Sequence, residues 1–321
     1  MSEVAVIGAG AWGTALAIQA ARAGRRVTLW ARDPERAAAI VATRENPRLP
    51  DARLPDTVQV TDALPGSADL FLLALPTQHL RAVASRLPVV ADAPLVSCAK
   101  GVEQGTLCLP LEILTAICPG ARAAVLTGPN FAHEIAAGLP AASVVAAADR
   151  EVREQVAALL ATPAFRLYGN DDPVGAQLGG AAKNVIAIAA GVVSGAGLGE
   201  NARAALITRG LAELGRLAAA SGGRAETMMG LSGLGDLLLT CTGPRSRNFS
   251  LGLALGRGES LAAVLAARTA VTEGVATAPA LVARAADVDL PICRAVAGLL
   301  AGETTVSEAI AALLARSRRD E

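Results

Sequence analysis

The chain has 321 residues, and its 29 basic and 29 acidic residues leave no formal net charge at pH 7. A neutral chain without a basic stripe argues against nucleic acid or an anionic membrane surface as the main partner. The length suggests two domains, and the composition, 52% hydrophobic with 2% aromatic residues and 72 alanines, predicts a helix-rich core of Ala, Leu and Val.

The cysteines and histidines exclude further classes of site. Five cysteines are scattered without a Cys-x-x-Cys pair, at Cys98, Cys108, Cys118, Cys241 and Cys293. They are typical of reduced core residues in a cytoplasmic protein. Because His79 and His133 are the only histidines, no metal site is expected. The first residues show no basic n-region followed by an apolar h-region, so no signal peptide is expected.

Strand and helix signals alternate through the first half of the chain. Val4–Ile7 is an apolar run, and a helical pattern over Thr14–Ala23 follows it. Val27–Trp30 is a second run and precedes a helix that begins at Pro34. Further buried strands are predicted at Leu70–Leu75, Leu95–Cys98, Ala123–Leu126, Ser143–Ala146 and Phe165–Tyr168. This alternation predicts an α/β domain with a parallel sheet covered on both faces.

The sequence GAGAWG at Gly8–Gly13 has the spacing G-x-G-x-x-G. It follows a strand and opens a helix, which is the context of a dinucleotide-binding fingerprint. Gly8 would permit the tight turn, Gly10 the approach of a pyrophosphate, and Gly13 close packing of helix on strand. The helix N-terminus would add N–H donors. The motif therefore predicts a Rossmann-type domain that binds NAD or NADP, with an ordinary glycine turn as the alternative.

The end of the second strand bears on the choice of cofactor. An acidic residue there would bind a ribose 2′-hydroxyl and favour NAD, whereas an arginine would pair with a 2′-phosphate. Here the strand is followed by Ala31, Arg32 and Asp33. Arg32 favours NADP, while Asp33 and the alternative of a solvated loop charge leave NAD open.

Only two of the 29 basic residues are lysines, Lys100 and Lys183. A lysine amine is compact and its pKa moves readily on burial, so both positions are candidates for chemistry. Lys100 follows the end of one predicted strand, and Gly128, Asn130 and Ala132 follow the end of another. Because ligands of an open parallel sheet bind outside the carboxyl ends of the strands, we expect these residues to line the mouth of the site.

After Asp172 the strand signals stop, and the periodicity from Pro173 to Arg319 is helical. We therefore predict a dinucleotide-binding Rossmann-like domain at residues 1–175 and an all-α substrate and catalytic domain at residues 176–321. The uncharged stretch Asn184–Gly199 is shorter than the roughly 20 residues of a membrane-spanning helix. It is expected to be a buried helix of a soluble protein.

Lys183 lies inside the small and apolar run QLGGAAKNVIAIAAG at Gln177–Gly191. We expect it to face the mouth of the sheet, where apolar surroundings would lower the pKa of its amine toward neutrality. Gly179 and Gly180 would leave room for a substrate beside it. The alternatives are a lysine that reaches the surface and a buried ion pair.

The Gly-rich stretch Gly230–Asn248 gathers a second set of polar side chains. Its candidate residues are Asp236, Thr240, Ser246, Arg247 and Asn248. An arginine beside amide and hydroxyl donors is suited to binding a phosphate. A capped helix–loop–helix would explain the Asp and the Ser, but not the full set.

Motifs distributed nearly end to end identify a resemblance. They are GAGAWGTALA at 8–17, LPD at 49–51, AKG at 99–101, TGPNFAHEIAAGLP at 127–140, QLGGAAKNVIAIAAG at 177–191, NARAALITRGLAE at 201–213, GLGDLLLTCTGPRSRN at 233–248 and VTEG at 271–274. In these motifs the chain resembles the bacterial NAD(P)-dependent glycerol-3-phosphate dehydrogenases. It departs from many members at Asn130, where they have Ser or Thr.

The resemblance implies a role for each candidate residue. Lys183 would be the catalytic lysine that gives a proton to the developing alkoxide, and Lys100 would help to bind substrate near the cofactor. Substrate contacts are implied for Gly128, Asn130, Asn184, Asp236, Thr240, Ser246, Arg247 and Asn248, with Arg247 and Asn248 on the phosphate. Cofactor contacts are implied for Gly8, Gly10, Ala11, Trp12, Gly13, Arg32, Lys100, Ala132, Arg247, Val271 and Glu273.

The activity that the resemblance implies is the reversible reduction of dihydroxyacetone phosphate to sn-glycerol 3-phosphate with NAD(P)H, feeding glycerophospholipid synthesis. The resemblance also suggests a cytoplasmic homodimer. Two alternatives remain: a related dehydrogenase of another hydroxy substrate, which would lack the Arg247–Asn248 pair, and a non-catalytic NAD(P)-binding sensor, which would need neither Lys183 nor Arg247.

Overall fold

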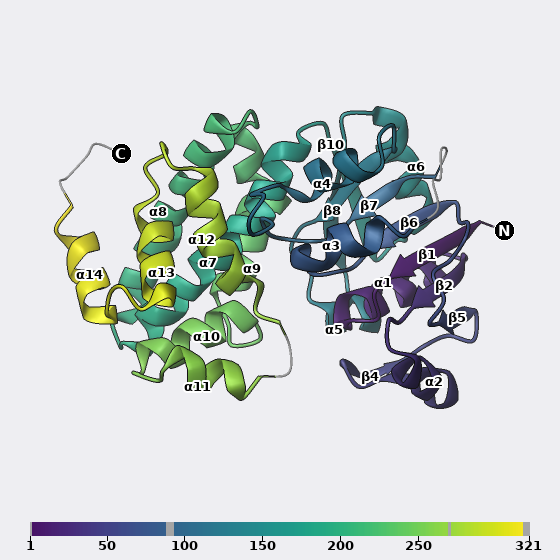
Figure 1. The fold of residues 1–321 in the computed structure, drawn as a ribbon, viewed down its shortest axis with the longest axis horizontal. Coiled ribbons are helices and arrows are strands. Elements are labelled where there is room, and N and C mark those ends of the chain that lie inside the picture. Colours follow the sequence, from purple (N-terminus) through teal and green to yellow (C-terminus); the bar gives the residue numbers. More distant parts are fainter. Residues whose placement is uncertain (1, 88–92, 269–270, 317–321) are drawn as a thin grey trace. The chain divides into compact units, whose positions relative to one another are not determined.

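The computed structural model describes residues 2–87, 93–268 and 271–316, and the chain forms two compact units (Figure 1). The first unit comprises Met1–Lys100 and Cys108–Gln177, and the second comprises Gly101–Leu107 and Leu178–Glu321. The predicted domain boundary between residues 175 and 176 stays a prediction. It lies two residues before the division between the units.

An eight-stranded sheet is the framework of the first unit, in the order β10-β9-β8-β7-β6-β1-β2-β5. Its strands are β1 (Glu3–Ile7), β2 (Arg26–Trp30), β5 (Val58–Thr61), β6 (Leu70–Leu73), β7 (Leu95–Ser97), β8 (Ala123–Thr127), β9 (Ala141–Ala146) and β10 (Phe165–Asn170). Every strand predicted from the sequence is present. The edge strand β5 and the small hairpin of β3 (Glu45–Asn46) and β4 (Leu49–Arg53) have weaker patterns and were not predicted.

One pairing departs from the predicted parallel sheet. Strand β9 runs antiparallel to β8, with Leu126 opposite Val145, and β10 runs parallel to β9. An antiparallel neighbour does not need the long crossover that a parallel one requires. Apolar periodicity does not report strand direction, so the sequence pattern could not show this reversal.

Helices cover both faces of the sheet, as predicted. They are α1 (Ala11–Arg22), α2 (Pro34–Thr43), α3 (Thr77–Ala84), α4 (Pro110–Ile117), α5 (Ala132–Ala137) and α6 (Arg150–Leu160). Alternate residues of β1 point to opposite faces: Val4 and Val6 join the apolar cluster that includes residues of α1, α2 and α6, whereas Ala5 and Ile7 join the cluster with α3 and α4. Both faces of this strand are therefore buried, which explains its continuous apolar sequence.

Among the described residues of the second unit, all regular secondary structure is helical. Its elements are α7 (Pro173–Gly195, which begins in the first unit), α8 (Gly199–Ala220), the 3₁₀ turn η1 (Ala225–Met229), the π-helical turn η2 (Leu231–Gly235), α9 (Asp236–Cys241), α10 (Arg247–Gly256), α11 (Leu261–Ala266), α12 (Glu273–Arg284), α13 (Pro291–Ala301) and α14 (Val306–Leu314). The predicted fold class, a Rossmann-type domain followed by an all-α domain, is confirmed.

Helices α7 and α10 cross at two glycine pairs, each with the spacing G-x-x-x-G. A Cβ atom on Gly252 would overlap the Ile188 carbonyl oxygen, and one on Gly191 would overlap that of Phe249. Gly195 and Gly256 are equally close to the opposite backbone. Small residues at this spacing let two helix backbones approach closely, a form of packing better known from membrane helices.

Helix α7 has the length and composition of a membrane span, so the argument that its apolar stretch is too short was wrong. The helix has 23 residues because it begins at Pro173, well before Asn184. However, 89% of its most apolar window is buried within the protein. Burial of this kind is typical of a core helix. The burial of α7, and not its length, therefore indicates that it is a core helix.

Candidate functional site

The three fingerprint glycines have the surroundings that their predicted roles require. Gly8 has a φ of +120°, and a Cβ there would lie 2.5 Å from the Ala74 carbonyl oxygen. A Cβ on Gly13 would overlap the carbonyl oxygen of Gly8, so helix α1 lies tightly against the turn. Gly10 has nothing within 4 Å of the same position. Open space at the middle glycine, with the α1 N-terminus beside it, fits the approach of a dinucleotide pyrophosphate.

Of the two charged residues after β2, Asp33 caps a helix and Arg32 is exposed to solvent. The Asp33 carboxylate caps α2, since Oδ1 accepts hydrogen bonds from the backbone N–H groups of Glu35 at 3.1 Å and Arg36 at 3.4 Å. Arg32 is exposed. The acidic residue that made the cofactor preference ambiguous therefore has a structural function of its own.

Trp12 links the fingerprint helix to the end of β7. Its indole N–H donates a hydrogen bond to the thiol of Cys98, two residues before Lys100. Burial raises the pKa of Cys98 to about 12, against the opposing effects of this hydrogen bond and of the Lys100 charge. Ala11 and Ala132 pack with Trp12 in one partly buried apolar cluster. These three predicted cofactor-contact residues thus lie together beside the fingerprint turn.

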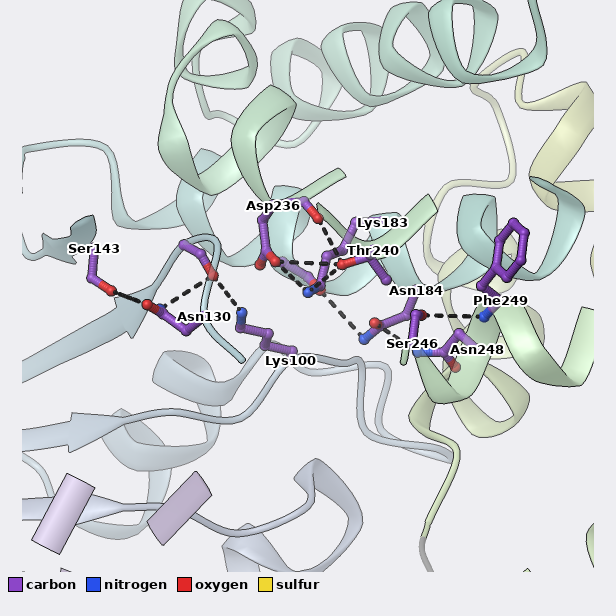
Figure 2. A network of polar contacts seen from close by, with 12 residues as sticks. Lys100, Asn130, Ser143, Lys183, Asn184, Asp236, Thr240, Ser246, Asn248 and Phe249 are labelled. Carbon is purple, nitrogen blue, oxygen red and sulfur yellow. Dashed lines mark hydrogen bonds and ion pairs between the residues drawn. The ribbon is translucent and has the colours of Figure 1, made fainter. Parts of the chain in front are cut away.

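Lys100 lies near Asn130 (Figure 2), and both belong to the first unit together with the predicted Gly128. The Lys100 Nζ donates to the Gly128 carbonyl oxygen at 3.0 Å, and the Asn130 amide donates to the same oxygen at 3.2 Å. Asn130 is also hydrogen-bonded to Ser143 of β9, at 2.6 Å through its Nδ2. Gly128 has a φ of +133° and lies against the backbone of Ser143, so a side chain at this position would be strained.

Lys183 forms a buried ion pair in the second unit (Figure 2). Its Nζ donates to Asp236 Oδ1 at 2.5 Å and to Thr240 Oγ1 at 2.9 Å. The Thr240 hydroxyl donates to the Asp236 carbonyl oxygen at 2.6 Å, which leaves a lone pair directed at the lysine. The Lys183 side chain is 9% exposed and that of Asp236 1% exposed, so the charges are held almost without water.

The backbone around this pair explains how it forms. Gly179 lies one turn before Lys183 on α7, and a Cβ there would lie 2.5 Å from the Ser232 carbonyl oxygen. The absence of a side chain lets η2 lie directly against α7, and α9 continues from η2 at Asp236. The space expected beside Gly179 is therefore filled by protein backbone and not left for a substrate. A π-helical turn at this point is typical of functional sites.

The ion pair changes the expected electrostatics of Lys183. Desolvation favours the neutral amine, whereas a carboxylate in contact favours the ammonium. The buried ion pair, one of the alternatives to purely apolar surroundings that the sequence left open, is the arrangement that the structure shows. The nearby thiol of Cys241 stays protonated at neutral pH, because burial raises the pKa of Cys241 to about 12, against the lowering effect of the Lys183 charge.

Asn184 and Asn248 form a second connection beside this pair. The Asn248 Nδ2 donates to Asn184 Oδ1 at 2.8 Å, and its Oδ1 accepts from the Gly274 N–H at 3.0 Å. A Cβ on Gly274 would lie 2.6 Å from that oxygen, which accounts for the glycine of the VTEG motif. Asn248 therefore joins α10 to α7 and α12, a bracing role that the phosphate interpretation did not include.

The start of α10 presents Arg247 to solvent. Ser246 caps the helix by accepting a hydrogen bond from the Phe249 N–H at 3.2 Å. The exposed Arg247 donates through Nη1 to the carbonyl oxygen of Val271, which itself precedes α12 and Glu273. Phosphate, with its negative charge, suits a helix N-terminus that carries an arginine and has no acidic residue in its first turn.

Two contributors escaped the sequence interpretation. Ser143 holds Asn130, but it was predicted only as the first residue of a buried strand. Arg268 contacts the start of α10, but it was one of 27 arginines with no motif around it. Neither residue type carries a local signal for such a role, since both depend on contacts between distant segments.

Together, the glycine fingerprint at the end of β1 and the lysine–carboxylate pair in a following helical unit define the class of Rossmann-type nicotinamide-dependent oxidoreductases. Family models for the N-terminus and C-terminus of NAD-dependent glycerol-3-phosphate dehydrogenase match residues 3–153 and 172–311. The chain belongs to this family.

Individual relatives agree with the family models. The chain is 57% identical to glycerol-3-phosphate dehydrogenase (NAD(P)+) of Acidiphilium cryptum, over 99% of this chain and 98% of the relative. It is 55% identical to the protein of the same name from Gluconobacter oxydans, over 98% and 97%. Among solved structures, glycerol-3-phosphate dehydrogenase of Coxiella burnetii matches with a TM-score of 0.93 and 36% identity, over 98% of this chain and 99% of the other.

Proposed function

We propose that the protein catalyses the reversible reduction of dihydroxyacetone phosphate to sn-glycerol 3-phosphate with NADH or NADPH, and that Lys183 supplies the proton. The buried pair of Lys183 and Asp236 carries the proposal, because it places one proton donor among apolar helices with a carboxylate to hold it. Membership of the family supports the reaction and the cofactor class.

Reduction of a ketone needs a hydride at the carbon and a proton at the oxygen. When bound, the reduced nicotinamide supplies the hydride to C2 of the substrate. Lys183 stabilises the negative charge that develops on the C2 oxygen and then gives it a proton. Asp236 and Thr240 fix the direction of the Lys183 amine, and Asp236 keeps the ammonium form populated until transfer. In the reverse direction the same nitrogen accepts the proton.

Phosphate recognition is assigned to the start of α10. The Arg247 guanidinium is exposed and the helix N-terminus adds a partial positive charge, so both attract a dianion. Asn248 and Asn184 hold α10 against α7, which keeps this anchor fixed relative to Lys183. Binding energy at the phosphate would then orient the carbonyl for reaction. In the first unit, hydrogen bonds join Lys100, Gly128 and Asn130 in a polar group. We propose that this group binds substrate and that Lys100 also contacts the cofactor.

The reaction is tested by adding dihydroxyacetone phosphate to the enzyme with reduced cofactor and following loss of the reduced-nicotinamide absorbance. Unphosphorylated dihydroxyacetone serves as the matched substrate. We expect turnover with the phosphate ester and at least about 100-fold lower kcat/KM without it, because the phosphate contacts are lost. Cofactor binding without turnover would support the sensor alternative. Equal rates with both substrates would support a dehydrogenase of another hydroxy compound.

We also propose that Arg32 favours NADPH over NADH. Its exposed guanidinium follows β2, where a 2′-phosphate would lie, and Asp33 is engaged in capping α2. Replacing Arg32 by methionine should lower kcat/KM for NADPH by about tenfold or more and leave the value for NADH nearly unchanged. Arg150→Met, at an exposed arginine of α6, is the control. An equal loss with both cofactors would contradict the assignment.

The remaining inferences concern the cellular setting. We propose a homodimer in the cytoplasm whose product supplies glycerophospholipid synthesis. An exposed apolar side chain on the second unit supports association: Leu314 of α14 is 81% exposed. A molar mass by light scattering twice that of the 32.2 kDa chain is the expected result, and a monomer across the working concentration range would contradict it.

A further inference from the structure

Arg268, two residues beyond α11, donates hydrogen bonds to three acceptors. Its Nη1 contacts the carbonyl oxygen of Arg247 at 2.7 Å and the Thr272 hydroxyl at 3.4 Å. Its Nη2 contacts the hydroxyl of Ser250 at 3.0 Å. One planar guanidinium thus reaches the first turn of α10 and the residue that precedes α12, as only the fork of an arginine can.

Arg247 makes the reciprocal contact. Its own Nη1 donates to the carbonyl oxygen of Val271 at 2.6 Å, next to Thr272. Arg268 therefore binds the main chain of Arg247, and Arg247 binds the main chain at Val271. Ser250 completes the arrangement by donating to the Arg247 carbonyl oxygen at 3.1 Å. The position of the Arg247 guanidinium consequently depends on segments that Arg268 contacts: the Arg247 carbonyl oxygen at one end, and the Thr272 hydroxyl, one residue after Val271, at the other.

The two guanidinium groups also interact through their charges. Partial burial lowers the pKa of Arg268, and the positive charge of Arg247 lowers it further, while Glu259 acts in the opposite direction. Two cations close enough to repel each other beside a helix N-terminus favour the binding of an anion. This agrees with a phosphate anchor at the start of α10.

We propose that Arg268 is a positioning residue for phosphate recognition, which holds the backbone carbonyl of Arg247 and the side chain of Thr272 so that the Arg247 guanidinium is directed at the phosphate of the substrate. The inference rests on the proposed function. Arg268 lies outside the motifs that identify the family. Its role depends on the hydrogen bonds of its guanidinium fork and not on its charge alone.

The test compares Arg268→Met with Arg268→Lys by steady-state kinetics of dihydroxyacetone phosphate reduction. We expect Arg268→Met to raise KM for this substrate by about tenfold with kcat within about twofold, because the anchor loses its orientation. Arg268→Lys keeps the charge but not the fork, so it should stay closer to the methionine variant than to the wild type. Arg294→Met, at an arginine that likewise binds carbonyl oxygens, of Ala286 and Val288, is the control and should leave KM unchanged.

A double variant tests whether Arg268 acts through Arg247. In an Arg247→Met background, Arg268→Met should cause little further loss of kcat/KM, since the residue that it positions is gone. Full additivity, or a wild-type KM in Arg268→Lys, would overturn the positioning role. A wild-type KM in Arg247→Met alone would instead show that the proposed phosphate anchor is wrong. If both Arg268 variants and Arg294→Met had a similarly low thermal unfolding midpoint, general destabilisation would explain the rise in KM. That result would likewise overturn the inference.

Discussion

Replacing Lys183 by methionine is expected to lower kcat by about a thousandfold or more while reduced cofactor still binds. Methionine has a similar length but no proton to give and no charge to place against the developing alkoxide, and each of these effects is worth roughly two to four orders of magnitude. The fingerprint glycines and Arg32 lie in the first unit, so the contacts that we propose for them with the dinucleotide would not depend on the side chain at 183. Steady-state turnover and a fluorescence titration with NADPH measure the two quantities.

The substitution also leaves Asp236 as a buried carboxylate without its counter-charge, which costs about 3–5 kcal/mol of stability. Lys183→Met combined with Asp236→Asn removes both charges and separates the loss of chemistry from the loss of stability. Lys183→Arg keeps the charge but holds its proton too tightly to transfer it at neutral pH, so it should also turn over slowly. If the stable double variant kept near-normal turnover, Lys183 would not be the proton donor.

Replacing Gly252 by alanine is expected to lower the free energy of unfolding by about 3 kcal/mol or more. The new methyl group would overlap the Ile188 carbonyl oxygen and lie 2.9 Å from the Val192 nitrogen, both of which are backbone atoms of α7. Neither can move without shifting the helix that carries Lys183. Activity should therefore fall along with stability, as measured by urea unfolding and by kcat.

Gly215 provides the matched control. It lies inside α8 with only the Ala225 methyl group, at 3.9 Å, near its missing side chain. Gly215→Ala should therefore raise stability by about 0.5–1 kcal/mol through helix propensity alone. If Gly252→Ala and Gly215→Ala changed the free energy of unfolding by equal and small amounts, the close crossing of α7 and α10 would not require a glycine at position 252.

Much of the first unit follows from local sequence. Apolar runs such as Val4–Ile7 are long enough to form buried strands, and the glycines of GAGAWG need their special backbone whatever surrounds them. The helical periodicity after Pro173 likewise predicted the second unit. These features depend on residues close together in the chain, which is why a sequence pattern can report them. The antiparallel direction of β9 depends on the path of a connection and left no such pattern.

The site was predicted as a set of residues, but not as an arrangement. Lys183 stood out because the chain otherwise uses arginine, yet its ion pair with Asp236 requires η2 to lie against Gly179. Asn248 was assigned to the phosphate alone, and its bridge between Asn184 and Gly274 depends on three helices. Contacts between segments many residues apart decide these details, and the periodicity of one segment carries no information about them.

The most direct test of the account is a single-turnover experiment on the Lys183–Asp236 pair. Enzyme in excess over NADPH is mixed rapidly with dihydroxyacetone phosphate, and oxidation of the bound cofactor is followed in the wild type and in Lys183→Met/Asp236→Asn. We expect rapid oxidation in the wild type and a rate lower by about three orders of magnitude in the folded variant. Equal rates in the two proteins would show that proton supply by Lys183 is not part of the chemical step.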